Sequence, residues 1–149
     1  RCTSPRIASG RTPNAMIKDE ILKYEPPAAK LLGREVIEID AVNGAAVLRY
    51  TAQPEFLNRH GTVQGGLLAA MLDSATALAL YAVLPPELTG VTISLNVSFL
   101  KPAKLSTFTA TAKLIRRDER TAETAGELRD PDGVLVATAT ATLRIVVRK

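Results

Sequence analysis

Apolar residues run almost without interruption from Leu67 to Leu84, near the middle of this 149-residue chain. A helix that is apolar on every face lies either in a protein core or in a membrane. Asp73 is the only charged residue in the run, and a carboxylate at the centre of a membrane helix costs about 2.5–3.5 kcal/mol. Much of the run is alanine, and Pro85 and Pro86 follow it. The pattern therefore predicts a helix buried in a protein core, which ends at the two prolines and carries one carboxylate into a dry place.

Alternating apolar and polar residues predict β-strands on both sides of this helix. Six segments alternate in this way: 37–41, 46–51, 91–100, 108–114, 121–129 and 135–145. The alternation places Ile37 and Ile39 on the inward face of the first segment, and Val91 and Ile93 on the inward face of the third. In the second segment the inward residues are Ala46, Leu48 and Tyr50, which alternate with Val47, Arg49 and Thr51. Asn43-Gly44, between the first two segments, predicts a two-residue hairpin turn.

The order of the segments predicts an α+β fold. A hairpin comes first, the long helix follows, and the last four strands form a meander. Since each strand has one apolar face, an antiparallel sheet curled around the helix would bury both the apolar face of the sheet and the apolar helix. Gly126 lies inside a strand, which indicates a bulge or a close backbone neighbour.

Two shorter helices are expected before the first strand, at Ala15–Tyr24 and Ala28–Leu32. The apolar side of the first would consist of Met16, Ile17, Ile21 and Tyr24. Residues 1–14 are rich in Ser, Pro, Gly and Arg and lack the apolar core of a signal peptide. We therefore expect a disordered tail, or a segment added for expression, at 1–14 and one domain at 15–149.

The net charge of +4 does not indicate a nucleic-acid-binding protein. Arg1, Arg6 and Arg11 lie in the first segment, which has no acidic residue, and no basic stripe is interleaved with aromatic residues. Cys2 is the only cysteine and cannot form a disulfide within the chain, as is usual in the reducing cytosol. We expect a cytoplasmic protein that binds neither nucleic acids nor membranes.

Asp73 is the leading candidate for a functional residue. A carboxylate in a helix core is costly unless it is hydrogen-bonded or its pKa rises. It therefore either bonds to local groups such as Ser74 and Thr76 or takes part in chemistry. Gly65 and Gly66 open the helix, where free N–H groups and the helix dipole favour a developing negative charge.

The segment from Asn58 to Gly66, NRHGTVQGG, with Asp73 downstream, resembles the N-x-x-G-x-x-H-G-G…D signature of the hotdog-fold thioesterases of the phenylacetate-pathway, PaaI-like type. Residues 90–104, GVTISLNVSFLKPAK, resemble the third strand of that family, and the similarity extends from Pro27 to the C-terminus. One residue departs from the signature: Gln64 stands where many members have histidine, although other members also have glutamine. The resemblance implies the hotdog fold, an antiparallel β-sheet wrapped around one long central helix.

The resemblance also implies an activity and its catalytic residues. The chain would be an acyl-CoA thioesterase that hydrolyses an aryl- or fatty acyl-CoA to the free acid and CoA. The Gly65 N–H would polarise the thioester carbonyl, Asn58 would help to hold the carbonyl or the water, and Asp73 would act as general base or nucleophile. Thr92 matches a hydroxyl that orients the attacking water, although the alternation places it on the polar face of its strand. Gln64 can hydrogen-bond but cannot deliver a proton, and a thiolate leaving group, whose thiol pKa is near ~8.5, needs little protonation.

Further residues are expected to bind the substrate rather than to react. Gly66 lies beside the carbonyl site, and Lys101 and Lys104 could meet the phosphates of coenzyme A, although solvated lysines beside a strand end are common. No cofactor is expected, because coenzyme A enters as part of the substrate. His60 is the only histidine and, without a cysteine or acidic cluster, is a poor metal ligand.

Helix geometry predicts that the active site is shared between two chains. Gly65 and Asp73 are eight positions apart on one helix, which is about 12 Å along its axis. One thioester carbonyl must lie ~3 Å from both the oxyanion donor and the attacking group. Two antiparallel helices about a two-fold axis would set Gly65 and Asn58 of one chain opposite Asp73 of the other. We therefore expect a homodimer, possibly assembled further into a tetramer.

Two other function classes remain open from the sequence. A hotdog enoyl-CoA hydratase or dehydratase would pair a histidine with a carboxylate, and His60 is the only candidate histidine. A non-catalytic acyl-CoA-binding protein would not need the intact set of Asn58, Gly65 and Asp73.

Overall fold

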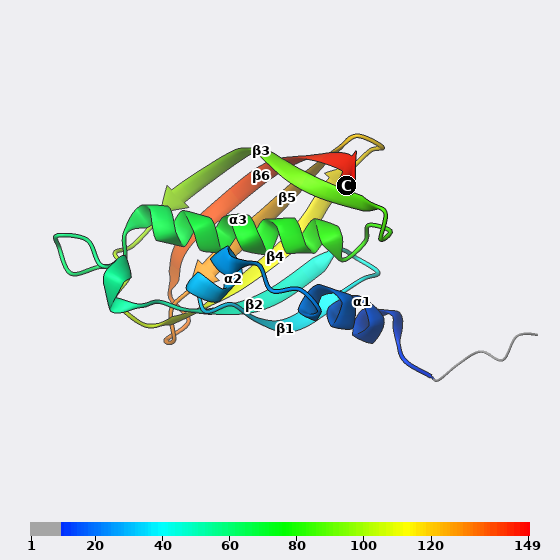
Figure 1. The fold of residues 1–149 in the computed structure, drawn as a ribbon. Coiled ribbons are helices and arrows are strands. Elements are labelled where there is room, and N and C mark those ends of the chain that lie inside the picture. The colour runs from blue at the N-terminus through cyan, green and yellow to red at the C-terminus, as the bar shows by residue number, and fades with distance from the viewer. Residues whose placement is uncertain (1–9) are drawn as a thin grey trace, which may run out of the picture.

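The structure, a computed structural model, describes residues 10–149 and contains a six-stranded antiparallel sheet with one long helix packed across it (Figure 1). The helices are α1 (Pro13–Leu22), α2 (Pro27–Leu31) and α3 (Gly65–Tyr81), and a 3-10 turn lies at Pro54–Phe56. The strands are β1 (Glu35–Asp40), β2 (Ala45–Thr51), β3 (Leu88–Phe99), β4 (Thr107–Arg117), β5 (Thr121–Arg129) and β6 (Leu135–Val147). None of the helices within residues 10–149 is both long and apolar enough to cross a membrane.

The predicted hotdog architecture is confirmed, since the sheet curls around α3, which packs against every strand from β2 to β6 (Figure 1). The predicted four-strand meander is wrong in one respect. The strand order is β1-β2-β4-β5-β6-β3, so only β4, β5 and β6 form a meander, and β3 crosses to the far edge to pair with β6. Alternation along a strand reports which face is buried, but it does not report which strand lies alongside.

The β1–β2 hairpin forms where it was predicted, but its turn spans residues 41–44 rather than two residues. The carboxylate of Asp40 accepts hydrogen bonds from the backbone N–H groups of Asn43, at 3.0 Å, and Val42, at 2.9 Å. These bonds, that of Asn43 first, lower the pKa of Asp40 below its usual value. Gly44, at φ 72°, closes the turn by donating to the carbonyl of Asp40.

A bulge in β1 overturns the predicted alternation there. The register shifts between Val36 and Glu38, so Val36 and Ile39 are buried and Ile37 is exposed. A bulge inserts one extra residue and rotates the following side chains to the other face. Alternation in β2 is confirmed, because its predicted inward residues are fully buried: Ala46, Leu48 and Tyr50.

One side of α3 is fully buried against the sheet, but the opposite side is not. The buried side chains are Leu68, Met71, Leu72, Ala75, Thr76, Leu78, Ala79 and Leu80. Gly66, Ala70, Asp73 and Ala77 share a stripe that is exposed or half-buried in the single chain. The prediction that the helix is buried on every face is therefore wrong for one chain alone, although the composition of the helix is apolar all round.

The N-terminal helices cover the β1 side of the sheet (Figure 1). Helix α1 begins at Pro13, inside the segment expected as a tail; residues 1–9 of that segment lie outside the described residues. Lys18 donates to the carbonyl of Ile37 at 3.0 Å and fixes α1 on β1. Ile17 and Ile21 pack against the core as predicted, whereas Met16 and Tyr24 are exposed.

Gly126 in β5 marks a close approach between the sheet and α3, as its place in a strand indicated. A Cβ atom at this position would lie 3.2 Å from Cγ2 of Thr76 and 3.3 Å from Cδ2 of Leu72. Such distances are shorter than ordinary van der Waals contact, so the helix could not lie this deep in the sheet above a larger residue.

Gly126→Val should lower the free energy of unfolding by about 1–3 kcal/mol, because the branched side chain would overpack against Thr76 and Leu72. Ala125→Val is the matched control, since Ala125 points to the other face of the same strand. Urea unfolding followed by circular dichroism measures both variants. Equal losses in the two variants would contradict the close approach.

Candidate active site

The loop before α3 is organised by the side chain of Asn58. Its Oδ1 accepts hydrogen bonds from the N–H groups of His60, at 2.9 Å, and Thr62, at 3.2 Å, and its Nδ2 donates to the Thr62 hydroxyl at 3.1 Å. Gly61, at φ 74°, closes the loop by donating to the carbonyl of Asn58. The Asn58 side chain therefore bonds to its own loop, which leads directly into the start of α3.

The N-terminus of α3 offers free backbone donors beside a hollow. The first N–H groups of a helix have no partner within it, and those of Gly65 and Gly66 have no hydrogen-bond acceptor within residues 10–149. The space beside Gly66 is open, whereas the ring of Phe99 lies 3.2 Å from the place that a Cβ of Gly65 would occupy. The hollow of ≈ 330 Å³ next to Gly65 is also lined by Lys101.

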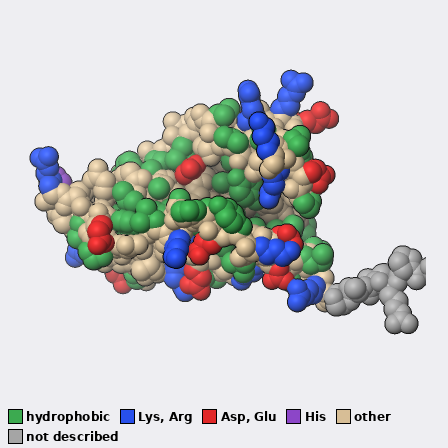
Figure 2. Space-filling model, in the orientation of Figure 1, with side chains coloured by type: hydrophobic (Ala, Val, Ile, Leu, Met, Phe, Trp, Pro, Cys, Tyr) green, Lys and Arg blue, Asp and Glu red, His purple; other side chains and the backbone are tan. Residues whose placement is uncertain are grey.

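Asp73 lies on the half-buried stripe of α3, and its carboxylate is held by one neighbour from the sheet. The Thr92 hydroxyl donates to Oδ1 of Asp73 at 2.8 Å. In Figure 2, hydrophobic side chains gather along this face of the molecule, whereas most charged side chains lie toward its edges. The carboxylate is hydrogen-bonded, as expected because a buried carboxylate without a partner is unfavourable. It is less deeply buried than the sequence indicated.

A bulge in β3 brings Thr92 to Asp73. The register with β6 shifts between Thr92 and Ser94, so Thr92 faces the helix while Val91 and Ile93 are exposed. The prediction that Val91 and Ile93 point inward is therefore wrong, and so is the placement of Thr92 on the polar face. The hydrogen bond between Thr92 and Asp73 was not predicted, since the family resemblance implied only that the Thr92 hydroxyl orients the attacking water.

The remaining predicted residues lie at the other end of α3 or on the surface. Gln64 is exposed at the N-cap position, where its side chain makes no capping hydrogen bond. Lys104 is exposed and does not line the hollow beside Gly65. His60 is exposed in the loop that Asn58 organises. Within one chain, Asp73 and Thr92 are in contact, whereas Gln64 and Gly65 lie about two helical turns away at the start of α3, and Asn58 lies in the loop before it.

A polar cluster beside Asp73 was missed by the sequence analysis. Arg34, which precedes β1, donates from its guanidinium to the Ser74 hydroxyl at 3.2 Å. The Tyr50 hydroxyl is fully buried next to this pair and makes no hydrogen bond of normal geometry with any residue from 10 to 149. Burial raises the pKa of Tyr50 to about 12. The positive charge of Arg34 lowers this pKa, and the negative charge of Asp73 raises it. The inward position of Tyr50 was predicted, but no sequence pattern places Arg34 at the middle of α3.

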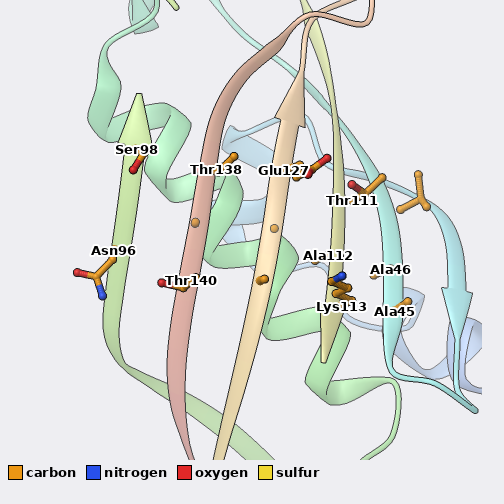
Figure 3. Close-up of a pocket in the computed structure, with 14 residues that line it drawn as sticks. Ala45, Ala46, Asn96, Ser98, Thr111, Ala112, Lys113, Glu127, Thr138 and Thr140 are labelled. Carbon is orange, nitrogen blue, oxygen red and sulfur yellow. The ribbon is translucent and has the colours of Figure 1, made fainter. Parts of the chain in front are cut away.

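A further hollow lies on the opposite face of the sheet, away from Asp73. It has a volume of ≈ 590 Å³ and is lined by residues of five strands, β2 to β6, including the outward side chains of Thr111, Glu127 and Thr140 (Figure 3). It contains none of the predicted site residues. Within residues 10–149, no three His, Cys, Asp or Glu side chains converge as metal ligands would.

Comparison with known proteins identifies the family. A sequence profile of the thioesterase superfamily matches residues 60–137, which is more than half of the chain. The chain belongs to the thioesterase superfamily. This result confirms the resemblance indicated by the segment from Asn58 to Gly66.

Individual members of the thioesterase superfamily align over most of the chain. The Escherichia coli K12 acyl-coenzyme A thioesterase PaaI is 35% identical over 100 residues, which cover 66% of this chain and 68% of PaaI. The Salmonella typhimurium medium/long-chain acyl-CoA thioesterase YigI is 28% identical over 141 residues, which cover 85% of this chain and 90% of YigI. The solved structure of a phenylacetic acid degradation-related protein from Ralstonia eutropha JMP134 is 41% identical, with a TM-score of 0.78, and covers 87% of this chain and 96% of that one.

Tyr50→Phe should change the pH dependence of stability. The pKa of Tyr50 in the folded chain, about 12, lies above its ordinary value of 10.0, so ionisation favours the unfolded chain. The contribution of the neutral Tyr50 to the free energy of unfolding is therefore complete below pH 10 and is lost as the pH rises toward 12. Relative to Tyr50→Phe, the wild type should lose about 1 kcal/mol of unfolding free energy between pH 9 and pH 11. Urea unfolding at both pH values measures this difference, and parallel curves for the two proteins would show that the phenol titrates normally.

Proposed function

We propose that this chain is an acyl-CoA thioesterase that hydrolyses an aryl- or fatty acyl-CoA to the free acid and CoA. The observation that carries the proposal is the carboxylate of Asp73, held by Thr92 on the open stripe of α3 in a member of the thioesterase superfamily. The names of the relatives PaaI and YigI support acyl-CoA as the substrate class. The name of YigI specifies medium- and long-chain acyl groups, and the similar Ralstonia eutropha protein is described as related to phenylacetic acid degradation, so the proposal covers both aryl and fatty acyl chains.

Asp73 can start the reaction in either of two ways. As a general base, it takes a proton from water while the water oxygen bonds to the thioester carbon. As a nucleophile, its oxygen bonds to that carbon and forms an anhydride, which water then cleaves. In both routes the C–S bond breaks and the thiolate of coenzyme A leaves, with little need of a proton donor because its thiol pKa is near ~8.5. Thr92 occupies one oxygen of Asp73 and leaves the other for the water or the carbonyl carbon.

The start of α3 would stabilise the negative charge on the carbonyl oxygen. The free N–H groups of Gly65 and Gly66 and the dipole of α3 favour an anion at this place. The hydrogen bonds of Asn58 within its loop support a role for Asn58 in positioning Gly65. This role would be in addition to the contact that we expect between Asn58 and the substrate. Gln64 is exposed next to these donors and can orient, but not protonate, a bound group.

The substrate's coenzyme A portion would approach the same end of α3. Lys101 lines the hollow beside Gly65 and can meet a phosphate, and Lys104 lies exposed nearby in sequence. We propose that the enzyme needs no cofactor, since coenzyme A enters as part of the substrate. We also propose that the protein is cytoplasmic. The hydratase alternative depends on His60, which is exposed in the loop before α3 and donates its backbone N–H to Asn58.

We further propose a homodimer in which each active site combines Gly65 of one chain with Asp73 of the other. The two residues lie on one helix, about 12 Å apart along its axis, so one chain cannot bring both to a single carbonyl. The half-buried stripe of small residues on α3 would be covered by a second chain. Strand β3 lies at the sheet edge with Val91 and Ile93 exposed, which also favours pairing with another copy.

Asp73→Asn should lower kcat by about 10² or more, because the amide keeps the shape of the carboxylate but cannot act as base or nucleophile. Thiol release from a panel of aryl- and alkyl-CoA esters measures the effect. Asp132→Asn is the matched control, since Asp132 lies exposed in the turn before β6, and this variant should keep full activity. Near-wild-type kcat in folded Asp73→Asn would make Asp73 a structural residue and refute the mechanism.

Asp73→Asn and Asn58→Ala, each inactive alone, should restore activity when their subunits exchange. A mixed dimer has one site with both lesions and one site with neither. Random equal mixing makes about half of the dimers mixed, so about a quarter of wild-type activity should return. Thiol release after refolding the two variants together measures the recovery, and differently tagged chains verify the mixed dimer. A verified mixed dimer without activity would exclude the shared site.

A further inference from the structure

A second groove lies between α1 and the C-terminal half of α3, and it has a volume of ≈ 360 Å³. Ile17 and Ile21 of α1 form one wall, and Leu78 and Tyr81 of α3 form the other. The Tyr81 hydroxyl donates to the carbonyl of Gly90 at 2.8 Å, so this ring is fixed in the wall. Grooves of this volume with apolar walls are suited to small organic ligands.

The groove carries more positive than negative charge. Arg34 lies in its wall and makes its hydrogen bond with the neutral Ser74, and no ion pair found within residues 10–149 includes Arg34. Arg148 also lines the groove. Glu20, the acidic residue that lines it, is paired with Lys23. A guanidinium has five N–H donors, so Arg34 keeps most of its donors for a bound group.

The groove adjoins the site of the proposed chemistry. Ser74, the partner of Arg34, directly follows Asp73 on α3, and the charges of Arg34 and Asp73 both act on the buried Tyr50. Ala77, one turn beyond Asp73 on the same stripe, is small and half-buried. If the thioester carbonyl lies at Asp73 and the acyl chain of the substrate extends toward the C-terminal end of α3, the acyl chain passes over Ala77 and meets the groove.

We propose that this groove holds the acyl group of the thioester, and that Arg34 makes the enzyme select short acyl groups that end in a carboxylate. The proposal rests on the proposed thioesterase function and replaces the aryl or fatty acyl group named there with a short acyl group that ends in a carboxylate. An alkyl chain in the groove would remove water from the guanidinium without replacing its hydrogen bonds, which is unfavourable. A carboxylate instead forms paired, charge-assisted hydrogen bonds with the guanidinium. Because Ser74 follows Asp73 directly, the carboxylate must lie only a few methylene groups from the carbonyl.

The test compares matched CoA esters that differ in the terminal group: glutaryl-CoA with pentanoyl-CoA, and adipoyl-CoA with hexanoyl-CoA. The wild type should hydrolyse the carboxylated member of a pair with a kcat/KM about tenfold higher or more. Arg34→Met should remove this preference, mainly by raising KM for the carboxylated ester, and should leave the alkyl ester as good a substrate or a better one. Arg34→Lys should keep part of the preference, because it retains the charge but not the planar pair of donors.

Arg49→Met is the matched control, since Arg49 is an exposed arginine of β2 that pairs with Glu35 outside the groove. It should keep the wild-type preference. A wild type that prefers the alkyl esters, or an Arg34→Met variant that loses both members of a pair equally, would overturn the assignment.

A binding experiment separates this inference from the proposed function. Non-hydrolysable thioether analogues of adipoyl-CoA and hexanoyl-CoA are titrated calorimetrically into wild type and Arg34→Met. Tighter binding of the carboxylated analogue by about tenfold, lost in Arg34→Met, supports the groove even if no ester is cleaved, in which case the proposed function alone fails. Equal affinities for the two analogues in the wild type would refute the selection by Arg34.

Discussion

The close packing of α3 into the curled sheet determines the remaining structure. Leu72 and Thr76, on the buried side of α3, lie against Gly126 of β5, a strand position that has no side chain. Gly126 leaves less than ordinary contact distance for a Cβ, and Ala139 lies on the neighbouring strand at the same level. On the opposite stripe of the same helix, Asp73 accepts a hydrogen bond from Thr92 of the edge strand β3. The helix that carries Asp73 is thus packed against residues outside the candidate active site.

Periodicity in the sequence was sufficient to predict the elements and their class, and it failed at two bulges and one crossover. The alternation in β2 is regular and was predicted correctly, because its register with β4 is unbroken from Ala45 to Thr51. In β1 and β3, one extra residue reverses the faces, and nothing in the local composition marks Val36 or Thr92 as the place. The position of β3 beside β6 depends on pairing between distant residues, which a local pattern does not encode.

The site was predicted in parts of different physical origin. Asp73 could be named as a candidate because a lone carboxylate contrasts with an apolar helix, and Gly65 because a helix start leaves free N–H groups. The hydrogen bonds of Asn58 within its loop could not be read from the signature, since they depend on the turn that Gly61 allows. Arg34 and Ser74 lie forty positions apart, and only the tertiary fold brings them together beside Tyr50.

The pairing of β3 with β6 also constrains when the site can form during synthesis. Thr92 is held opposite Leu143, which belongs to the strand of the sheet that is made last. When β3 has left the ribosome, it has no neighbour in the sheet, and its exposed Val91 and Ile93 remain open to wrong partners. Asp73 therefore gains its hydroxyl partner only after β6 has closed against β3. A chain that is interrupted before β6 would present a carboxylate without its sheet neighbour, so the contact between Asp73 and Thr92 arises at the end of translation rather than in stages.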